Sequence, residues 1–325
     1  MTKKYPLSPA MLEFVQRSES FFPAHILDKG LAAQRKAYHA MTGHFARVLP
    51  ETVTWDDEQL CGVNVRRYQS LHPENAQRLL FVHGGGFYLG SLDSHHSFCA
   101  QLADDCHLNV ISIDYSLAPE APYPCALDEL LSVYQTLLLE DSGPIILLGD
   151  SAGANLIAAL TLRTRDRSIK AAAGQVLIYP GLALPGTLPS HQLLADAPLL
   201  DSASIKFCLQ NYAGLCNGEN NPQGADLLSN LSDTARGEIA PLSAPSLADL
   251  PAALILAAQY DPLIDDAQHY HQRLQDAGGC SSLKVIQGLV HGGLHGIGLS
   301  AEADQLYQVI CSHINELCST TKHRQ

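Results

Sequence analysis

One stretch near the middle of the chain reads Leu147-Leu148-Gly149-Asp150-Ser151-Ala152-Gly153-Ala154-Asn155. The apolar run from Pro144 to Leu148 predicts a short buried strand, and the alanine- and leucine-rich run from Ala152 to Arg163 predicts a helix. A glycine two residues away on either side of the serine leaves room for a tight turn, and Ser151 stands at the positive end of the helix dipole. The stretch therefore presents one hydroxyl group on a strand-to-helix turn.

The spacing Gly-x-Ser-x-Gly is typical of the nucleophile elbow of α/β-hydrolases, in which the serine occupies a strained turn at the top of a sheet. The same residues also fit an ordinary tight turn. The two interpretations differ in whether the chain also holds an oxyanion-binding loop, an acid and a base in the order that this fold requires. The sequence contains a candidate for each.

A glycine-rich loop precedes the elbow. The strand predicted over Arg78 to Val82 runs into His83-Gly84-Gly85-Gly86-Phe87. Consecutive glycines cost conformational entropy on folding, so such a run needs a reason. Backbone N–H groups that face an oxyanion supply one, since a single donor contributes about 3 kcal/mol to transition-state stabilisation. A merely flexible loop is the alternative, but we expect an oxyanion hole formed by Gly84, Gly85, Gly86 and Ala152.

An acidic residue follows a later predicted strand. Asp261 comes at the carboxyl end of the run from Ala252 to Gln259, where catalytic groups gather in parallel sheets. Asp265 and Asp266 compete with it, but they fall in the first turn of the next predicted helix, where carboxylates complement the helix dipole. Asp261 is therefore the predicted catalytic acid.

Two histidines follow the last predicted strand. His291 lies in Leu289-Val290-His291-Gly292-Gly293, and His295 comes four residues later. We predict His291 as the base because it comes first, in a glycine-flanked loop close to the strand end. A neutral His291 would take the proton of Ser151 and return it to the leaving group, while Asp261 fixes its tautomer.

Strand and helix patterns alternate on both sides of the elbow. Such alternation predicts right-handed crossovers and an α/β fold with a mostly parallel central sheet flanked by helices. The length of 325 residues suits one large domain or two smaller ones, and we expect a single α/β-hydrolase domain over residues 1–325. The other predicted strands are 109–115, 175–179, 252–258 and 283–286, and the other predicted helices are 94–107, 122–139, 264–277 and 301–317.

Three segments depart from this alternation. Residues 8–47 carry helical spacing and predict two helices, the first starting at Ser8-Pro9. Glu51 to Trp55 and Val63 to Tyr68 predict an antiparallel hairpin at the sheet edge, separated by Asp56-Asp57-Glu58. Residues 182–250 are proline-rich, with short helical stretches such as Ser202 to Tyr212, and are too long for a plain loop. We expect this insertion and residues 1–50 to form a helical cap.

The composition limits the possible partners. A net charge of −13 argues against nucleic acid and anionic membranes, and no apolar run approaches the length of a membrane span. The nine cysteines are scattered without a Cys-x-x-Cys pair, and the N-terminus lacks the apolar core of a signal peptide, so we expect a cytoplasmic protein with free thiols. No metal is expected, because His95-His96, His269-x-His271 and the pair His291 and His295 lack a carboxylate or cysteine at a recognised ligand spacing.

As a set, these motifs resemble those of the bacterial hormone-sensitive-lipase-like esterases. The resemblance runs from about residue 78 to the end, and it rests on His83-Gly84-Gly85-Gly86-Phe87, Gly149-Asp150-Ser151-Ala152-Gly153, Asp114-Tyr115 with Ala118-Pro119-Glu120, Asp261-Pro262-Leu263, and His291-Gly292. It implies a serine carboxylesterase that hydrolyses short-acyl, acetyl-like esters through an acyl-enzyme and without a cofactor.

The resemblance also implies roles by position. Ser151 corresponds to the nucleophile, His291 to the base and Asp261 to the acid. Gly85, Gly86 and Ala152 correspond to the oxyanion donors, with Gly84 in the same turn, while Asp150 and Glu120 match structural positions. The chain departs from many members at Gly292-Gly293, where an aromatic residue is common after the catalytic histidine.

Two other functions stay open on the sequence. The same triad serves any acyl transfer, so an amidase or lactonase is the alternative enzyme. A regulatory binding protein on a hydrolase scaffold is the alternative of a different class. The expected ligand is a small-molecule ester, the expected state is a monomer or a homodimer, and a regulatory protein partner is compatible with the sequence.

Overall fold

The computed structural model describes residues 4–23, 25–73, 77–141, 143–215 and 231–322. Their strands form one eight-stranded sheet in the order β1-β2-β4-β3-β5-β6-β7-β8. The strands from β4 to β8 are parallel, whereas β2 is antiparallel to both of its neighbours. The predicted α/β class is thereby confirmed. The strands are β1 (Val53–Leu60), β2 (Val63–Ser70), β3 (Arg78–Val82), β4 (Asn109–Asp114), β5 (Ile145–Asp150), β6 (Gly174–Ile178), β7 (Ala253–Tyr260) and β8 (Ser281–Val290).

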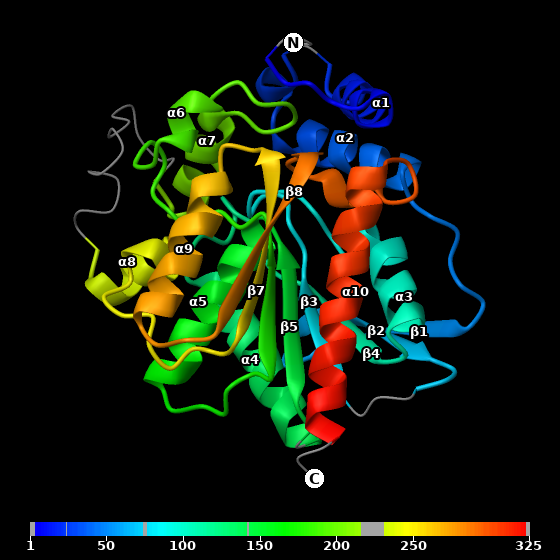
Figure 1. Ribbon diagram of the computed structural model, residues 1–325, viewed down its shortest axis with the longest axis vertical. Coiled ribbons are helices and arrows are strands. Elements are labelled where there is room, and N and C mark those ends of the chain that lie inside the picture. Colours follow the sequence, from blue (N-terminus) through cyan, green and yellow to red (C-terminus); the bar gives the residue numbers. More distant parts are fainter. Residues whose placement is uncertain (1–3, 24, 74–76, 142, 216–230, 323–325) are drawn as a thin grey trace.

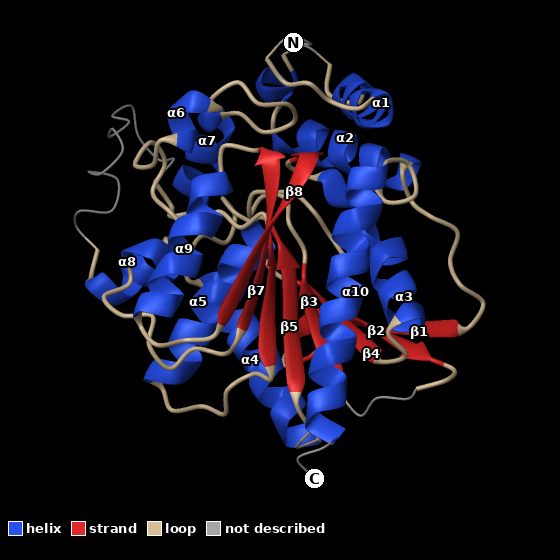
Figure 2. Ribbon diagram, in the orientation of Figure 1, coloured by secondary structure: helices blue, strands red, loops and turns tan. Residues whose placement is uncertain are grey.

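Helices cover both faces of this sheet (Figure 2). Leu80 and Val82 of β3 belong to the core that includes α4, α5 and α9, whereas Leu79 and Phe81 belong to the core that includes α3 and α10. A strand covered on both faces is apolar on both, which explains the continuous run of apolar residues in β3. The helices are α1 (Pro9–Ser20), α2 (Leu31–His44), α3 (His96–Asp105), α4 (Cys125–Glu140), α5 (Ala152–Asp166), α6 (Ser190–Leu193), α7 (Ser202–Tyr212), α8 (Asp233–Ile239), α9 (Ile264–Asp276) and α10 (Ala301–Lys322).

Helices α1, α2, α6 and α7 gather at the end of the sheet toward which the arrows of β7 and β8 point (Figure 1). The two helices expected over residues 8–47 are thus present, and the Ser8 side chain caps α1 by accepting the N–H of Met11. Residues 216–230 of the expected insertion lie outside the described residues. Four helices from distant parts of the chain therefore meet at the carboxyl end of the parallel strands, where such sheets bind ligands.

The antiparallel hairpin is present, but its turn is not where the sequence predicts it. β1 continues through Asp56-Asp57-Glu58, and the chain turns at Cys61-Gly62, whose φ angles are 52° and 82°. Two-residue hairpin turns favour such positive φ angles. The prediction was wrong because these carboxylates are not turn formers here. Two of them pair across the exposed edge of the sheet, Asp57 with Arg66 and Glu58 with Arg67.

A buried ion pair fastens α8 to the core helices. Arg163 of α5 donates to both carboxylate oxygens of Glu238 in α8, and it also pairs with Asp128 of α4. Arg163 and Glu238 are each 5% exposed. We expect Arg163→Met to lower the free energy of unfolding by about 3–5 kcal/mol, because Glu238 then stays buried without its counter-ion. Urea denaturation measures this loss.

The matched control is Arg67→Met. The Arg67 guanidinium pairs with the more exposed carboxylates of Glu58 and Glu140, so we expect a loss of about 1 kcal/mol or less. The double variant Arg163→Met/Glu238→Leu should regain most of the stability that Arg163→Met loses, since no unpaired charge remains buried. Equal losses in Arg163→Met and Arg67→Met would contradict the assignment.

Candidate active site

Ser151 occupies the turn between β5 and α5 with φ 53° and ψ −118°. Residues other than glycine rarely adopt this conformation, so surrounding contacts have to hold it. The Ser151 N–H donates to the carbonyl of Ile178 in β6 at 2.8 Å. The backbone of β3 also packs directly against this turn. A Cβ atom added at Gly153 would lie only 2.0 Å from the Val82 carbonyl oxygen. The Gly-x-Ser-x-Gly stretch thus forms the expected tight turn, and its second glycine is required by contact with β3.

Three side chains from three elements meet at this turn. His291 directly follows β8, and its Nε2 lies 2.9 Å from the Ser151 Oγ while its Nδ1 lies 2.7 Å from the Asp261 Oδ2. Asp261 follows β7, is 1% exposed, and accepts the Leu263 N–H through its other oxygen. A carboxylate in this place keeps the proton on Nδ1, so Nε2 accepts the serine hydroxyl. The structure brings together the three residues that the sequence selects.

The competing histidine is placed differently. His295 Nε2 lies 3.4 Å from the Tyr38 hydroxyl oxygen, and the ring packs against that of His95. Burial lowers the pKa of His295 to about 3, and the neighbouring His95 contributes to this shift. His295 therefore lines the same cavity, but its ring is neutral and hydrogen-bonds to Tyr38 of α2.

The competing carboxylates bind the insertion. Asp265 accepts the N–H of Ser190, and the buried Asp266 accepts the N–H groups of Leu182 and Ala183. Asp266 also lies 2.7 Å from the Nε2 of His191. Sequence reasoning assigned both aspartates only to the helix dipole. It missed these bonds because their partners are 75 to 84 residues away and no local motif marks them.

The glycine turn after β3 supplies backbone N–H groups. Gly84 donates its N–H to the Asp150 carboxylate at 2.8 Å, so this group is not available to an oxyanion, and the expectation for Gly84 was wrong. The N–H groups of Gly85 and Gly86 have no acceptor within the part of the chain that the structure describes. Ala152 opens α5, where first-turn N–H groups lack helical acceptors. The N–H groups of Gly85, Gly86 and Ala152 therefore remain as candidate oxyanion donors.

Asp150 holds this turn as a buried charge. Burial favours the neutral acid, but His95, whose Nε2 lies 3.3 Å away, and the Gly84 N–H outweigh it and lower the pKa of Asp150. The ionised carboxylate is a stronger acceptor for the Gly84 N–H than the neutral acid. Asp150 therefore anchors the first peptide of the glycine turn from beside the nucleophile.

Histidines packed beneath the site make the fold sensitive to acid. Burial lowers the pKa of His83 to about 4, as it lowers that of His295 to about 3. Both lie below the unfolded value of about 6.5, so the unfolded chain binds protons first. The free energy of unfolding has its full value above about pH 6.5. At lower pH it falls by up to about 1.4 kcal/mol per pH unit for each histidine. Urea denaturation at pH 7, 6 and 5 tests this. His295→Gln should reduce the slope of the free energy of unfolding against pH. A wild-type free energy of unfolding that stays constant from pH 7 to pH 5 would contradict the prediction.

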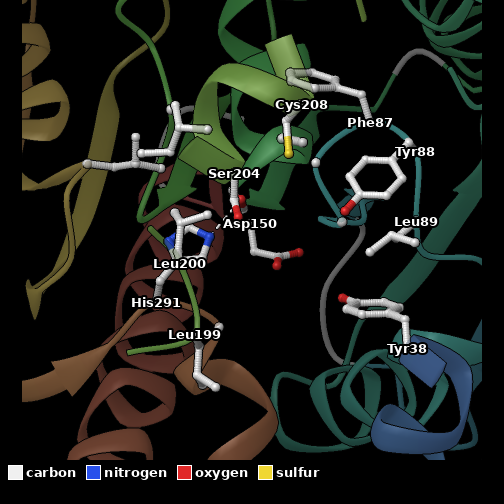
Figure 3. A pocket seen from close by; sticks show the side chains of 18 of the residues that line it. Tyr38, Phe87, Tyr88, Leu89, Asp150, Leu199, Leu200, Ser204, Cys208 and His291 are labelled. Carbon is white, nitrogen blue, oxygen red and sulfur yellow. Dashed lines mark hydrogen bonds between the residues drawn. The ribbon is translucent and has the colours of Figure 1, made fainter. Parts of the chain in front are cut away.

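The serine opens into a cavity of about 470 Å³. Figure 3 shows Leu199, Leu200 and His291 on one side of it and Tyr38, Tyr88 and Leu89 on the other. Among the described residues that line the cavity, Asp150 and Glu19 carry carboxylates, and neither lysine nor arginine contributes. Apolar walls with a few convergent polar groups are typical of small-molecule sites.

No three side chains of histidine, cysteine, aspartate or glutamate within the described ranges are grouped to hold a metal ion. None of the described helices combines the length and apolarity needed to cross a membrane.

A family model described as alpha/beta hydrolase fold matches residues 79–295. The chain belongs to the α/β-hydrolase fold family. The hydrolase is 37% identical to Esterase LipI of Mycobacterium tuberculosis over 228 residues, which are 68% of this chain and 67% of that protein. It is 29% identical to the acetyl esterase of Salmonella typhi over 318 residues, which cover 93% of this chain and 92% of the relative.

The fold of the hydrolase also matches solved structures. A crystal structure of an esterase from the bacterial hormone-sensitive lipase family superposes with a TM-score of 0.83 at 23% identity, covering 96% of this chain and 99% of the other. At that identity the match concerns the fold. The family match and the esterase relatives confirm the resemblance to esterases of this fold that the motifs indicate.

Proposed function

We propose that the hydrolase cleaves short-chain, acetyl-like carboxylic esters through an acyl-enzyme formed at Ser151. The reaction class, carboxylic ester hydrolysis, is that of its esterase relatives. The observation that carries the proposed mechanism is the continuous pair of hydrogen bonds from Ser151 through His291 to Asp261, beside a glycine turn whose Gly85 and Gly86 N–H groups have no acceptor among the described residues.

Each step uses groups of this chain. His291 Nε2 takes the Ser151 proton as Oγ attacks the ester carbonyl, and the Asp261 carboxylate stabilises the imidazolium that forms. The N–H groups of Gly85, Gly86 and Ala152 donate to the oxyanion, and the positive end of α5 favours the same charge. His291 then returns the proton to the leaving alcohol. Water, activated by His291, releases the acid in the second half of the reaction.

The cap assignment rests on what lines the cavity. Phe14 of α1, Tyr38 and Met41 of α2, and Ile205 of α7 all face it, and they come from residues 1–50 and from the insertion over 182–250. We propose that these two segments form the cap of a single α/β-hydrolase domain over residues 1–325. Acyl-chain preference then depends on their side chains, since each buried methylene contributes about 0.8 kcal/mol.

We propose a small-molecule ester as the ligand and the cytoplasm as the location. Among the described residues, the cysteines at positions 61, 99, 125, 208 and 280 are free thiols, which supports a reducing compartment.

Hydrolysis of p-nitrophenyl esters from acetate to laurate tests the proposal. We expect a burst of p-nitrophenolate and the highest kcat/KM with the shortest acyl chains, and no burst in Ser151→Ala of native circular dichroism. A preference for laurate would overturn the short-acyl assignment. A folded wild type that turns over none of the esters would overturn the function, and turnover of anilides or lactones in its place would favour an amidase or lactonase.

A further inference from the structure

We propose that Arg35 is a positioning residue of the esterase site, one that holds the oxyanion turn in place from the cap helix α2. The proposal rests on the function proposed above. Arg35 lies about fifty residues before the glycine turn in sequence, and no motif connects the two.

The guanidinium group of Arg35 makes four hydrogen bonds. Its Nε donates to the Tyr88 carbonyl at 2.9 Å, and Nη2 donates to the Ala118 carbonyl at 3.2 Å. Nη1 and Nη2 each donate to one oxygen of Glu120 at 2.7 Å. The planar group thus has its donors directed at two backbone carbonyls and one carboxylate at once, which the single ammonium of a lysine cannot reproduce.

Stability alone does not explain this arrangement. The side chains of Arg35 and Glu120 are 32% and 59% exposed. An ion pair at that exposure contributes about 1 kcal/mol or less to folding. The bonds to the two carbonyls instead fix where the backbone of residues 88 and 118 lies.

That backbone is bonded directly to the oxyanion turn. The N–H groups of Tyr88 and Leu89 both donate to the Gly85 carbonyl, at 3.2 and 2.8 Å, and the Ala118 N–H donates to the Phe87 carbonyl at 2.9 Å. The Gly85 carbonyl belongs to the same planar peptide as the Gly86 N–H, which points the opposite way. Holding the carbonyl therefore sets the direction of the proposed oxyanion donor.

The same helix forms part of the cavity wall. Gln34, Tyr38 and Met41 of α2 line the cavity, at spacings that place them on one helix face. Arg35 is adjacent to this face and binds the loop that carries Tyr88 and Leu89, which also line the cavity. One side chain thus connects a cap helix to both the wall and the oxyanion turn.

The test compares Arg35→Met with Arg67→Met on p-nitrophenyl butyrate at 25 °C. A misplaced oxyanion donor costs rate in the transition state, so we expect Arg35→Met to lower kcat about 10- to 100-fold with KM changed less than threefold. Arg67 makes a similar carboxylate pair far from the loop, and Arg67→Met should keep kcat within twofold. Glu120→Gln, which retains both carbonyl contacts of Arg35, should fall between them.

A reversible trifluoromethyl ketone inhibitor supplies the second readout, because its hemiketal oxyanion occupies the same donors. We expect its Ki to rise in Arg35→Met by the factor by which kcat/KM falls, and Arg35→Lys to recover only part of either. Wild-type kcat and Ki in Arg35→Met, with only a lower melting temperature, would overturn the proposal. An inactive wild type would instead overturn the proposed function, so the two failures are distinguishable.

Discussion

Replacing Ser151 by alanine, or His291 by alanine, is expected to lower kcat for p-nitrophenyl acetate by about 10⁶-fold. The two side chains share one hydrogen bond, and the attack needs both the Oγ nucleophile and the Nε2 that takes its proton. Because they act as a unit, the double variant should lose no more than either single variant. Steady-state rates corrected for spontaneous hydrolysis measure all three.

His295→Ala is the matched control for His291→Ala. The contact of His295 Nε2 is with the Tyr38 hydroxyl, so its loss should change kcat by less than about tenfold, through packing rather than through proton transfer. An inactive His295→Ala together with an active His291→Ala would reassign the base. A double variant far slower than both single variants would show that Ser151 and His291 act independently.

Asp261→Asn is expected to lower kcat by about 10⁴-fold at neutral pH. The Asp261 carboxylate accepts the His291 Nδ1–H, and an asparagine amide in its place allows the wrong tautomer, in which Nε2 carries the proton and cannot act as a base. The expected loss is smaller than that of Ser151→Ala because the nucleophile and the oxyanion donors remain.

Asp265→Asn serves as the control for this variant. Asp265 accepts the Ser190 N–H in the insertion and an asparagine oxygen can still accept it, so kcat should stay within about tenfold. Full activity in Asp261→Asn with loss in Asp265→Asn would move the acid to the helix.

Local patterns predicted most of the fold. The turn at Ser151 and the strand-helix alternation depend on residues close in sequence, and α7 begins and ends at the predicted Ser202 and Tyr212. β8 is longer than the strand predicted from Leu283 to Ile286, because its alternating exposed residues pair with β7 although they lack an apolar signal. Edge strands depend on pairing partners, which local periodicity does not reveal.

The site divides in the same way. Ser151, Asp261 and His291 each follow a strand end, and parallel strands bring such ends together, so their meeting could be foreseen. The hydrogen bond from the Gly84 N–H to Asp150 could not be predicted, because it depends on the side-chain direction of a residue 66 positions away. The contacts of Arg35 with Tyr88 and Glu120 could not be predicted for the same reason, since these residues are 53 and 85 positions away in sequence.

The contact between Gly153 and the Val82 carbonyl has a consequence for redesign of the enzyme. The turn that carries the nucleophile packs against β3 through bare backbone, so on that side no side chain can be varied to change its surroundings. Variation in substrate preference then depends on the side chains that line the cavity from α1, α2 and α7 and from the segments that precede α2 and α7. A mutant library confined to Ile26, Met41, Leu199 and Ile205 would explore new substrates while the catalytic turn stays invariant.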